Sequence, residues 1–415
     1  MKIAVVGSGI SGLSAAYFLS KRHKVDLFEK EDHFGGHSFT IDVEYQKEEN
    51  KKISIDIGFI VFNHQTYPNF VNFLKENKID IEKSNMSFSV SVKETEIEYC
   101  GKGLRGIFSN RKNLFNFKFI KMFFDIINFY KKNSDLKSIN EKETLEDYLK
   151  KQNLSEYFVN YHIIPMVSAI WSMPPHESKQ MPLKFFLKFF QNHGLFKLKN
   201  RPQWYTIKNR SRTYVNKILE NISGEYYKNY KINKLIRTSN GVKLYYGDNA
   251  EFFDYEKIVL ATHADEALSI IENPSEDEKN ILSNFHYKKN IAVIHTDEKV
   301  MPKNKKAWSS WNSLLDKNDI KKNSITYWLN LLQNLNIEKN IFITLNPFFE
   351  IEKNKIIRTV NFTHPYYNHK SLISQKKLNS LQNKKNILYC GSYFGYGFHE
   401  DGIKSSIEMI KYLND

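Results

Sequence analysis

The sequence predicts an α/β protein whose parallel sheet takes strands from both ends of the chain. Three features predict this fold class: an apolar run at residues 2–6, a buried strand in KIVLATH at 257–263 and a third apolar run that begins at residue 387. The first and third runs each lead into a glycine-rich turn and then a stretch typical of a helix. Continuous apolar runs of this length are typical of strands covered on both faces, and alternation with helices favours a parallel arrangement.

The chain opens on a motif typical of dinucleotide binding. A β-branched strand, KIAVV, is followed directly by a GxGxxG turn, a helical stretch and a second strand that ends at Glu29. This order of strand, glycine turn, helix, strand and acid is that of a Rossmann-like unit, and the flanking elements make a chance match a minor alternative. The turn consists of Gly7, Ser8, Gly9, Ile10, Ser11 and Gly12.

Each part of the motif has a physical role. Gly7 permits the tight turn, Gly9 has no side chain to obstruct a pyrophosphate, and Gly12 lets the helix pack closely on the strand. The start of the helix offers unpaired N–H groups and a positive dipole end to phosphate. Glu29 can accept hydrogen bonds from ribose hydroxyls, which favours NAD or FAD over NADP, and Lys30 is a further candidate contact.

A second glycine pair helps to decide between NAD and FAD. It follows soon after the acid and resembles the FAD-specific extension of the glutathione-reductase and amine-oxidase groups, although an ordinary glycine turn explains it equally well. Further along, a strand is followed by a glycine and an apolar segment that we expect near the flavin ring. These candidate cofactor contacts are Gly35, Gly36, His37, Gly58, Phe59 and Ile60.

Changes of pattern along the chain predict two interleaved domains. One is a Rossmann-like FAD-binding domain of the glutathione-reductase and amine-oxidase type, and the other is a mixed α+β substrate domain. The FAD-binding domain is assigned residues 1–85, 221–285 and 376–415. The substrate domain is assigned residues 86–220, which are largely helical, and the strands of residues 286–375.

A second glycine-rich turn lies near the carboxy terminus, where Gly391 follows a buried strand and precedes a helix. The first amides of that helix can stabilise negative charge on a reduced flavin, and an ordinary turn is the alternative. His399, Glu400 and Tyr396 are candidates for catalysis, by acid–base work or as walls beside the ring. Helix capping and plain packing are the competing roles. Cys390 is predicted to be a small buried residue, and not a covalent flavin attachment.

Composition narrows the functional classes further. The two cysteines allow no disulfide framework, which favours a reducing, cytoplasmic location. No CxxC or HExxH spacing indicates a metal site. The formal net charge is +15, but no nucleic-acid-binding module accompanies it, so we expect no nucleic-acid partner. No signal peptide and no transmembrane helix are expected, because the apolar runs are too short.

Two basic, aromatic segments, residues 104–132 and 183–199, allow two interpretations. Lysines on anionic headgroups and phenylalanines in the lipid would make them membrane-surface helices, with the protein peripheral on the inner face of the membrane. Alternatively, they are amphipathic helices packed on the protein's own core.

The longer motifs are similar to those of a known family. The chain resembles bacterial FAD-dependent amine oxidoreductase-like, NAD/FAD-binding proteins associated with cyclopropane-fatty-acid synthases. More distantly, it resembles monoamine oxidases and phytoene desaturases in the wider flavin amine oxidase superfamily. The motifs that carry the resemblance are GSGISGLSAAY, FGGHS, DIGFIVFNHQTYPNF, YHIIPMVSAIWSM, NHGLFKLKNRPQW, ATHADEAL and CGSYFGYGFHEDGIKSSIE.

The resemblance implies non-covalent FAD, a two-domain fold and a reaction on lipid acyl chains. One departure concerns Asn209 and Arg210, which stand where related flavoproteins carry a glycine pair, and this predicts a reshaped loop near the substrate domain. The remaining cofactor contacts expected along the chain are Ile232, Ala261, Thr262, Asp401, Gly402 and Ile403.

Together these observations predict an FAD-dependent oxidoreductase that transfers a hydride between flavin N5 and an apolar, fatty-acyl lipid. The protein's work would be to orient a C–H bond against the flavin and to exclude water. Two alternatives stay open. One is a flavin amine oxidase, and the other is an FAD-binding accessory protein whose partner is a lipid methyltransferase or a cyclopropane synthase.

Overall fold

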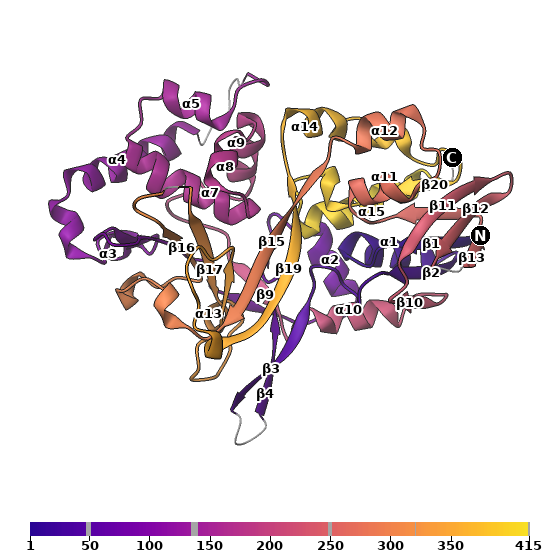
Figure 1. Cartoon of the computed structure of the whole chain (residues 1–415), viewed down its shortest axis with the longest axis horizontal. Coiled ribbons are helices and arrows are strands. Elements are labelled where there is room, and N and C mark those ends of the chain that lie inside the picture. Colours follow the sequence, from indigo (N-terminus) through magenta and orange to yellow (C-terminus); the bar gives the residue numbers. More distant parts are fainter. Residues whose placement is uncertain (47–50, 134–139, 248–250, 320, 414–415) are drawn as a thin grey trace.

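The computed structural model describes residues 1–46, 51–133, 140–247, 251–319 and 321–413, and a five-stranded parallel sheet lies at one end of it (Figure 1). Neighbouring strands pair in parallel throughout this sheet. The sheet takes strands from both ends of the chain, as the sequence predicts, and only the strand at Lys257–Leu260 lies between the first strand and the last. In order across the sheet, the strands are β10 (Tyr226–Lys228), β2 (Lys24–Glu29), β1 (Lys2–Val6), β14 (Lys257–Leu260) and β20 (Ile387–Tyr389).

Helices cover one face of the parallel sheet. Their apolar side chains, among them Leu13 and Ile403, form one buried cluster with Val5 and Leu27 of the strands. This cluster includes Tyr214, so the helix at Arg212–Leu219 packs against the helix at Ile10–Ser20, although the sequence assigned residues 86–220 to the other domain. The helices are α1 (Ile10–Ser20), α2 (Pro68–Glu76), α10 (Arg212–Leu219) and α15 (His399–Lys411).

The opposite face of the parallel sheet is covered by an antiparallel meander and two short helices. Val6 and Phe28 of the sheet are buried there against Leu235, Leu244 and Ile281. Because both faces are covered, the strands are continuous apolar runs. The covering elements are β11 (Ile232–Thr238), β12 (Gly241–Tyr246), β13 (Glu251–Tyr255), α11 (Ala264–Ile270) and α12 (Glu276–Leu282).

The second domain is built on a seven-stranded sheet. All of its neighbouring strands are antiparallel except β7 and β16, which are parallel. Strands from residues 86–100 thus join strands from residues 286–366, and the long β15 and β19 run beside the first domain (Figure 1). In order, the strands are β19 (Ile356–Tyr366), β15 (His286–His295), β18 (Phe342–Leu345), β17 (Asn323–Trp328), β16 (Trp311–Leu315), β7 (Phe88–Val92) and β8 (Glu98–Cys100).

A group of helices packs on this sheet through a large aromatic core that contains Phe119, Phe158 and Phe186. A π-helical turn at Val159–Ile163 precedes α7. Among the helices of the described residues, none combines the length and apolarity that crossing a bilayer requires. The group comprises α3 (Gly103–Ile107), α4 (Phe117–Asn133), α5 (Leu145–Lys151), α6 (Glu156–Phe158), α7 (Ile164–Trp171), α8 (Pro175–Lys179) and α9 (Leu183–Asn192).

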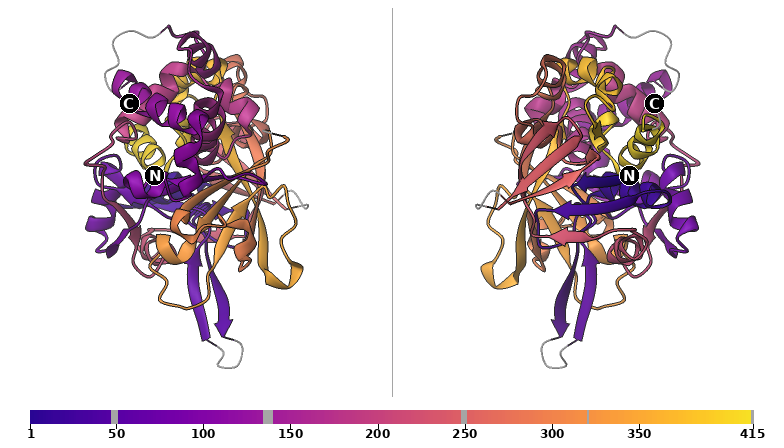
Figure 2. Two further views of the ribbon diagram at one scale, coloured as in Figure 1. Left: turned by 90° about the vertical axis from the view of Figure 1, so that its left-hand side faces the viewer. Right: turned by 90° about the vertical axis from the view of Figure 1, so that its right-hand side faces the viewer.

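Smaller elements connect the two domains. A β-hairpin extends away from the body of the molecule (Figure 2), and a three-stranded sheet lies near its base. One strand of that sheet, β9, lies in a region whose pattern predicted mainly helix. These elements are β3 (Thr40–Gln46), β4 (Lys51–Asp56), β5 (Phe62–Asn63), β6 (Ile81–Ser84), β9 (Trp204–Ile207), α13 (Leu329–Leu332) and α14 (His369–Gln375).

Candidate functional site

The first glycine turn has the geometry expected for close packing. Gly7 has a φ of 96°, in the left-handed region that favours glycine, and its amide donates to the Phe28 carbonyl at 2.8 Å. A Cβ on Gly12 would overlap the carbonyl oxygen of Gly7. These two positions therefore exclude side chains because backbone already occupies the space.

Gly9 differs from these two glycines, because the protein leaves room for a side chain at this position. A Cβ added there would meet no protein atom within 4 Å, so this face of the turn is open. Gly9 is also the N-cap of α1, no side chain caps the helix, and its first turn has no acidic residue. The first amides of a helix have no partner within it and lie at the positive end of its dipole. The open face of Gly9 is thus a cradle suited to a phosphate.

Glu29 lies at the end of β2 beside this cradle. One carboxylate oxygen accepts from the amide and the hydroxyl of Ser8, at 3.0 and 2.5 Å, and the other accepts from the Glu31 amide at 3.0 Å. Three donors hold the buried carboxylate in place and leave lone pairs for a further donor. Lys30 instead pairs with Glu266 of α11 at 2.5 Å.

The second glycine pair packs directly on the first turn. The Gly35 amide donates to both the carbonyl and the hydroxyl oxygen of Ser8, each at 3.1 Å. A Cβ on Gly36 would lie 3.0 Å from the Cα of Gly9, and both residues of the pair have positive φ. The pair therefore forms one wall of the cradle. A glycine turn on the surface would make no such contacts with the first turn.

His37 extends that wall and has an unsatisfied polar atom. Its carbonyl accepts from the Phe59 amide at 2.7 Å, and a Cβ on Gly58 would overlap the same carbonyl. Its buried Nε2 has no hydrogen-bond partner among the described residues. Burial, with the neighbouring His364, lowers the pKa of His37 well below its ordinary value. A neutral, unpartnered imidazole nitrogen marks a place where a bound molecule can supply the missing partner.

The carboxy-terminal helix meets the amino-terminal one at this cradle. A Cβ on Gly402 would lie 2.7 Å from the Cγ2 of Ile10 and from the hydroxyl of Ser11. Asp401 accepts from the Phe398 amide at 3.0 Å, and burial raises the pKa of its carboxyl to about 7. Ile403 is fully buried. The structure thus brings the two predicted glycine segments together, with two helix N-termini side by side.

The histidine predicted as catalytic lies in a packed environment. The Nε2 of His399 lies 2.9 Å from the Ser38 hydroxyl and 3.3 Å from the Tyr214 hydroxyl. Its ring stacks on Phe59 with a centroid separation of 3.5 Å. Burial lowers the pKa of His399 to about 3, so the imidazole is neutral at physiological pH.

Glu400 has the contacts of a helix cap. Its carboxylate accepts from the backbone and side-chain amides of Asn69, at 3.1 and 2.6 Å, and from the Phe70 amide at 3.0 Å. Both residues lie in the first turn of α2, whose amides have no partner within the helix. These contacts account for an acid at this position, and its catalytic role stays a prediction.

Tyr396 lies against an aromatic surface of the second domain. Its ring centroid is 4.8 Å from that of Phe185 and 5.4 Å from that of Phe189, both on α9. Phe398 stacks on Phe189 at 5.2 Å, and Tyr367 contacts Phe185 at 4.7 Å. Burial raises the pKa of Tyr396 to about 12. The carboxy-terminal loop therefore has the cradle on one side and apolar rings on the other.

The remaining predicted contacts lie around the same sheet. A Cβ on Gly7 would approach the carbonyl oxygen of Ala261 at 2.9 Å and the amide of Thr262 at 3.2 Å. The Gly391 amide donates to the Ser405 hydroxyl at 2.9 Å, and Ile232 is buried at the start of β11. Cys390 is fully buried, and burial raises the pKa of its thiol, which keeps it protonated.

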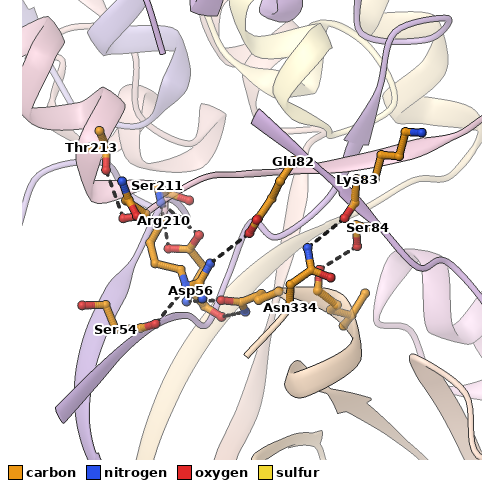
Figure 3. A network of polar contacts seen from close by, with 12 residues as sticks. Ser54, Asp56, Glu82, Lys83, Ser84, Arg210, Ser211, Thr213 and Asn334 are labelled. Carbon is orange, nitrogen blue, oxygen red and sulfur yellow. Dashed lines mark hydrogen bonds and ion pairs between the residues drawn. The ribbon is translucent and has the colours of Figure 1, made fainter. Parts of the chain in front are cut away.

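A buried polar network lies beside the site, and the sequence did not signal it (Figure 3). Asp56 accepts from the Thr40 hydroxyl at 2.6 Å and from the Ser211 amide at 3.0 and 2.9 Å. The Gln333 side chain forms two further bonds with the Asp56 backbone, at 2.9 and 2.7 Å. The network ties β4 to the start of α10 and to α13, and so joins the two domains.

The departure at residues 209–210 belongs to this network. Asn209 and Arg210 both have positive φ, 62° and 77°, in the left-handed region that favours glycine, and a reshaped loop stays a prediction. Arg210 donates to the Ser54 carbonyl at 2.8 Å and lies 3.7 Å from Glu82 (Figure 3). These contacts offset the cost of left-handed backbone at a residue with a side chain.

Comparisons with known proteins agree with this geometry. Residues 5–76 match the model of the NAD(P)-binding Rossmann-like domain family, the part of the chain that contains the cradle. A search of curated protein sequences found no match. Within the described residues, no three His, Cys, Asp or Glu side chains form a group that could hold a metal ion.

Solved structures of similar fold include enzymes of two kinds. A fatty acid isomerase from P. acnes that produces CLA has a TM-score of 0.67 at 12% identity, with 99% of this chain and 97% of that chain covered. Cyclohexylamine oxidase from Brevibacterium oxydans has a TM-score of 0.67 at 13% identity, with 100% and 99% covered. Putrescine oxidase bound to putrescine has a TM-score of 0.69 at 10% identity, with 100% of both chains covered. The chain therefore has a mixed α/β fold with a Rossmann-like domain, in the architecture of these amine oxidases.

Proposed function

We propose that this protein is an FAD-dependent oxidoreductase that acts on an apolar, fatty-acyl lipid. One observation carries the proposal: Ile10 and Ser11, which follow the open face of Gly9 at the uncapped start of α1, lie directly against Gly402 at the start of α15. A dinucleotide held at the first helix would extend toward the second. The Rossmann-like match over residues 5–76 supports the dinucleotide, and the second glycine pair favours FAD.

The residues present fit such a cofactor, held non-covalently. Glu29 keeps acceptor capacity for ribose hydroxyls, and the amides that follow Gly9 would hold the pyrophosphate. The orphaned Nε2 of His37 would gain a polar partner. The amides at the start of α15, next to Asp401, would face the ring system. When bound, FAD would supply hydride acceptance from a C–H bond, or its reverse.

The chain's own contribution would be to orient the substrate and exclude water. The buried rings of Phe185 and Phe189 and the partly buried ring of Phe398 form an apolar wall beside the loop that precedes α15. Because burial raises the pKa of Asp401 to about 7, this carboxyl can hold a proton at the start of α15 near neutral pH. An apolar chain lying on these rings would lose contact with water, which supports a lipid as substrate.

A flavin amine oxidase is the second candidate, because two of the similar structures are amine oxidases. In that case Tyr396, with the neighbouring rings, would form an aromatic cage for an amine. The third candidate is an FAD-binding accessory protein of a lipid methyltransferase. An experiment must distinguish it from the two enzymes.

Anaerobic mixing of the purified, FAD-loaded protein with candidate substrates tests these functions. We expect free fatty acids or membrane lipids, and not amines, to bleach the flavin absorbance, because only apolar chains match the aromatic surface. Bleaching by amines would establish the second candidate instead. If neither class bleaches a flavin that dithionite still reduces, the protein is not an oxidoreductase for these substrates. Free FAD without protein is the control for bleaching outside the site.

A further inference from the structure

The helices α3 and α4 lie at the end of the second domain that is farthest from the chain termini (Figure 1). Several large apolar side chains of this end are exposed to solvent. Phe115 and Phe117 are 84% and 86% exposed, so their rings have almost no contact with the rest of the chain. They lie at the junction of a 3₁₀ helix, Arg111–Phe115, and α4. Large apolar side chains in such positions cost solvation free energy unless something covers them.

More apolar side chains extend the same surface, which we name the basic–aromatic tip and define as residues 102–124. Leu104, Leu114 and Phe124 are 65%, 47% and 57% exposed. The opposite face of α4, which includes Phe119 and Met122, is buried in the core of the domain. Packing on the protein's own core therefore explains only one face of α4. The outward face has further apolar residues that the core does not cover.

Charge in the basic–aromatic tip has a single sign. The segment contains no Asp or Glu. Lys102 donates to the Trp308 carbonyl, and Lys112 pairs with Glu96 from the neighbouring strand connection. The other basic side chains are exposed, and none has an ion pair with any described residue. They are Arg105, Arg111, Lys118 and Lys121.

We propose that the basic–aromatic tip docks on an anionic lipid bilayer. Phenylalanines placed among unpaired cations suit such a bilayer. The rings would lie at the level where the acyl chains begin, and the cations would lie at the headgroups. A second copy of the chain is disfavoured as the occupant, because its tip would bring the same positive charges against these. The inference goes beyond the proposed function, and its test does not use the flavin.

Vesicle sedimentation with the full chain tests the docking. The wild type is expected to bind phosphatidylcholine vesicles that contain phosphatidylglycerol, to bind pure phosphatidylcholine weakly, and to lose binding as salt rises. Phe115→Ser with Phe117→Ser should lower binding by about tenfold or more, because the two rings that would insert into the bilayer are removed. Lys118→Glu with Lys121→Glu should lower it by a similar factor.

Matched variants elsewhere on the surface serve as controls. Phe252→Ser with Ile373→Ser removes two exposed apolar side chains far from the tip in sequence, and should leave binding unchanged. Lys370→Glu with Lys377→Glu gives the same change of net charge and should have a smaller effect than the change at the tip. Unchanged thermal midpoints would show that all variants are folded.

Two results would overturn the proposal. In one, the tip variants bind anionic vesicles as well as the wild type does. In the other, sedimentation velocity without lipid shows a dimer that the Phe115→Ser and Phe117→Ser changes abolish, which would make the tip a protein interface.

Discussion

Replacing Gly12 with alanine is expected to lower the free energy of unfolding by about 3 kcal/mol or more. The added Cβ would overlap the carbonyl oxygen of Gly7, which belongs to backbone and cannot rotate away as a side chain would. Relief requires α1 to move off the sheet, where Leu13 is fully buried between helix and strands. Urea unfolding followed by circular dichroism measures the loss.

Gly9→Ala is the matched control for that change. Both substitutions add one methyl group to the same turn, but a Cβ on Gly9 meets no atom within 4 Å, and its φ of −60° suits alanine. We therefore expect the free energy of unfolding of Gly9→Ala to stay within about 0.5 kcal/mol of the wild type, or to rise slightly. Equal losses for the two variants would contradict the assigned geometry of the turn.

The second large effect is a pH dependence that arises from Asp56. Burial raises the pKa of this carboxyl from 3.8 to about 6 in the folded protein. Between these values the folded state holds a proton that the unfolded state has lost, so this group's contribution to stability is complete below about pH 4. This contribution to the free energy of unfolding is lost as pH rises through about 6. The shift of the Asp56 pKa corresponds to about 3 kcal/mol.

Asp56→Asn, which cannot ionise, isolates this contribution. The free energy of unfolding of the wild type minus that of the variant should fall by about 3 kcal/mol between about pH 4 and pH 7. Asp42→Asn is the control on the same hairpin, because the Ser54 hydroxyl, with Arg212, lowers the pKa of Asp42, and its contribution has the opposite sign. A wild-type minus Asp56→Asn difference that does not change with pH would contradict the assigned environment.

Local patterns made much of the fold predictable. The strand, glycine turn and helix at residues 2–20 could be predicted because each role is set within a few residues. Gly7 needs positive φ and Gly12 needs close packing, and both constraints come from adjacent backbone. The carboxy-terminal strand and helix were predictable for the same reason.

Features that depend on distant contacts could not be predicted. Asp56 meets Ser211 and Gln333 only after three separate segments have packed, so no local spacing marks the network. The short strands β9 and β10 are held by pairing with neighbours more than by their own patterns. For Glu400, an acid at the start of a helix suits catalysis or capping equally in sequence, and only the position of α2 reveals the cap.

The central claim is that the open face of Gly9 holds the phosphates of FAD, and titration of flavin-free protein with FAD tests it most directly. Wild-type protein should take up FAD, whereas Gly9→Val should fold normally but bind about tenfold to a hundredfold more weakly, because its side chain fills the cradle. Wild-type protein that takes up no FAD, or a folded Gly9→Val variant that binds it with unchanged affinity, would contradict the account.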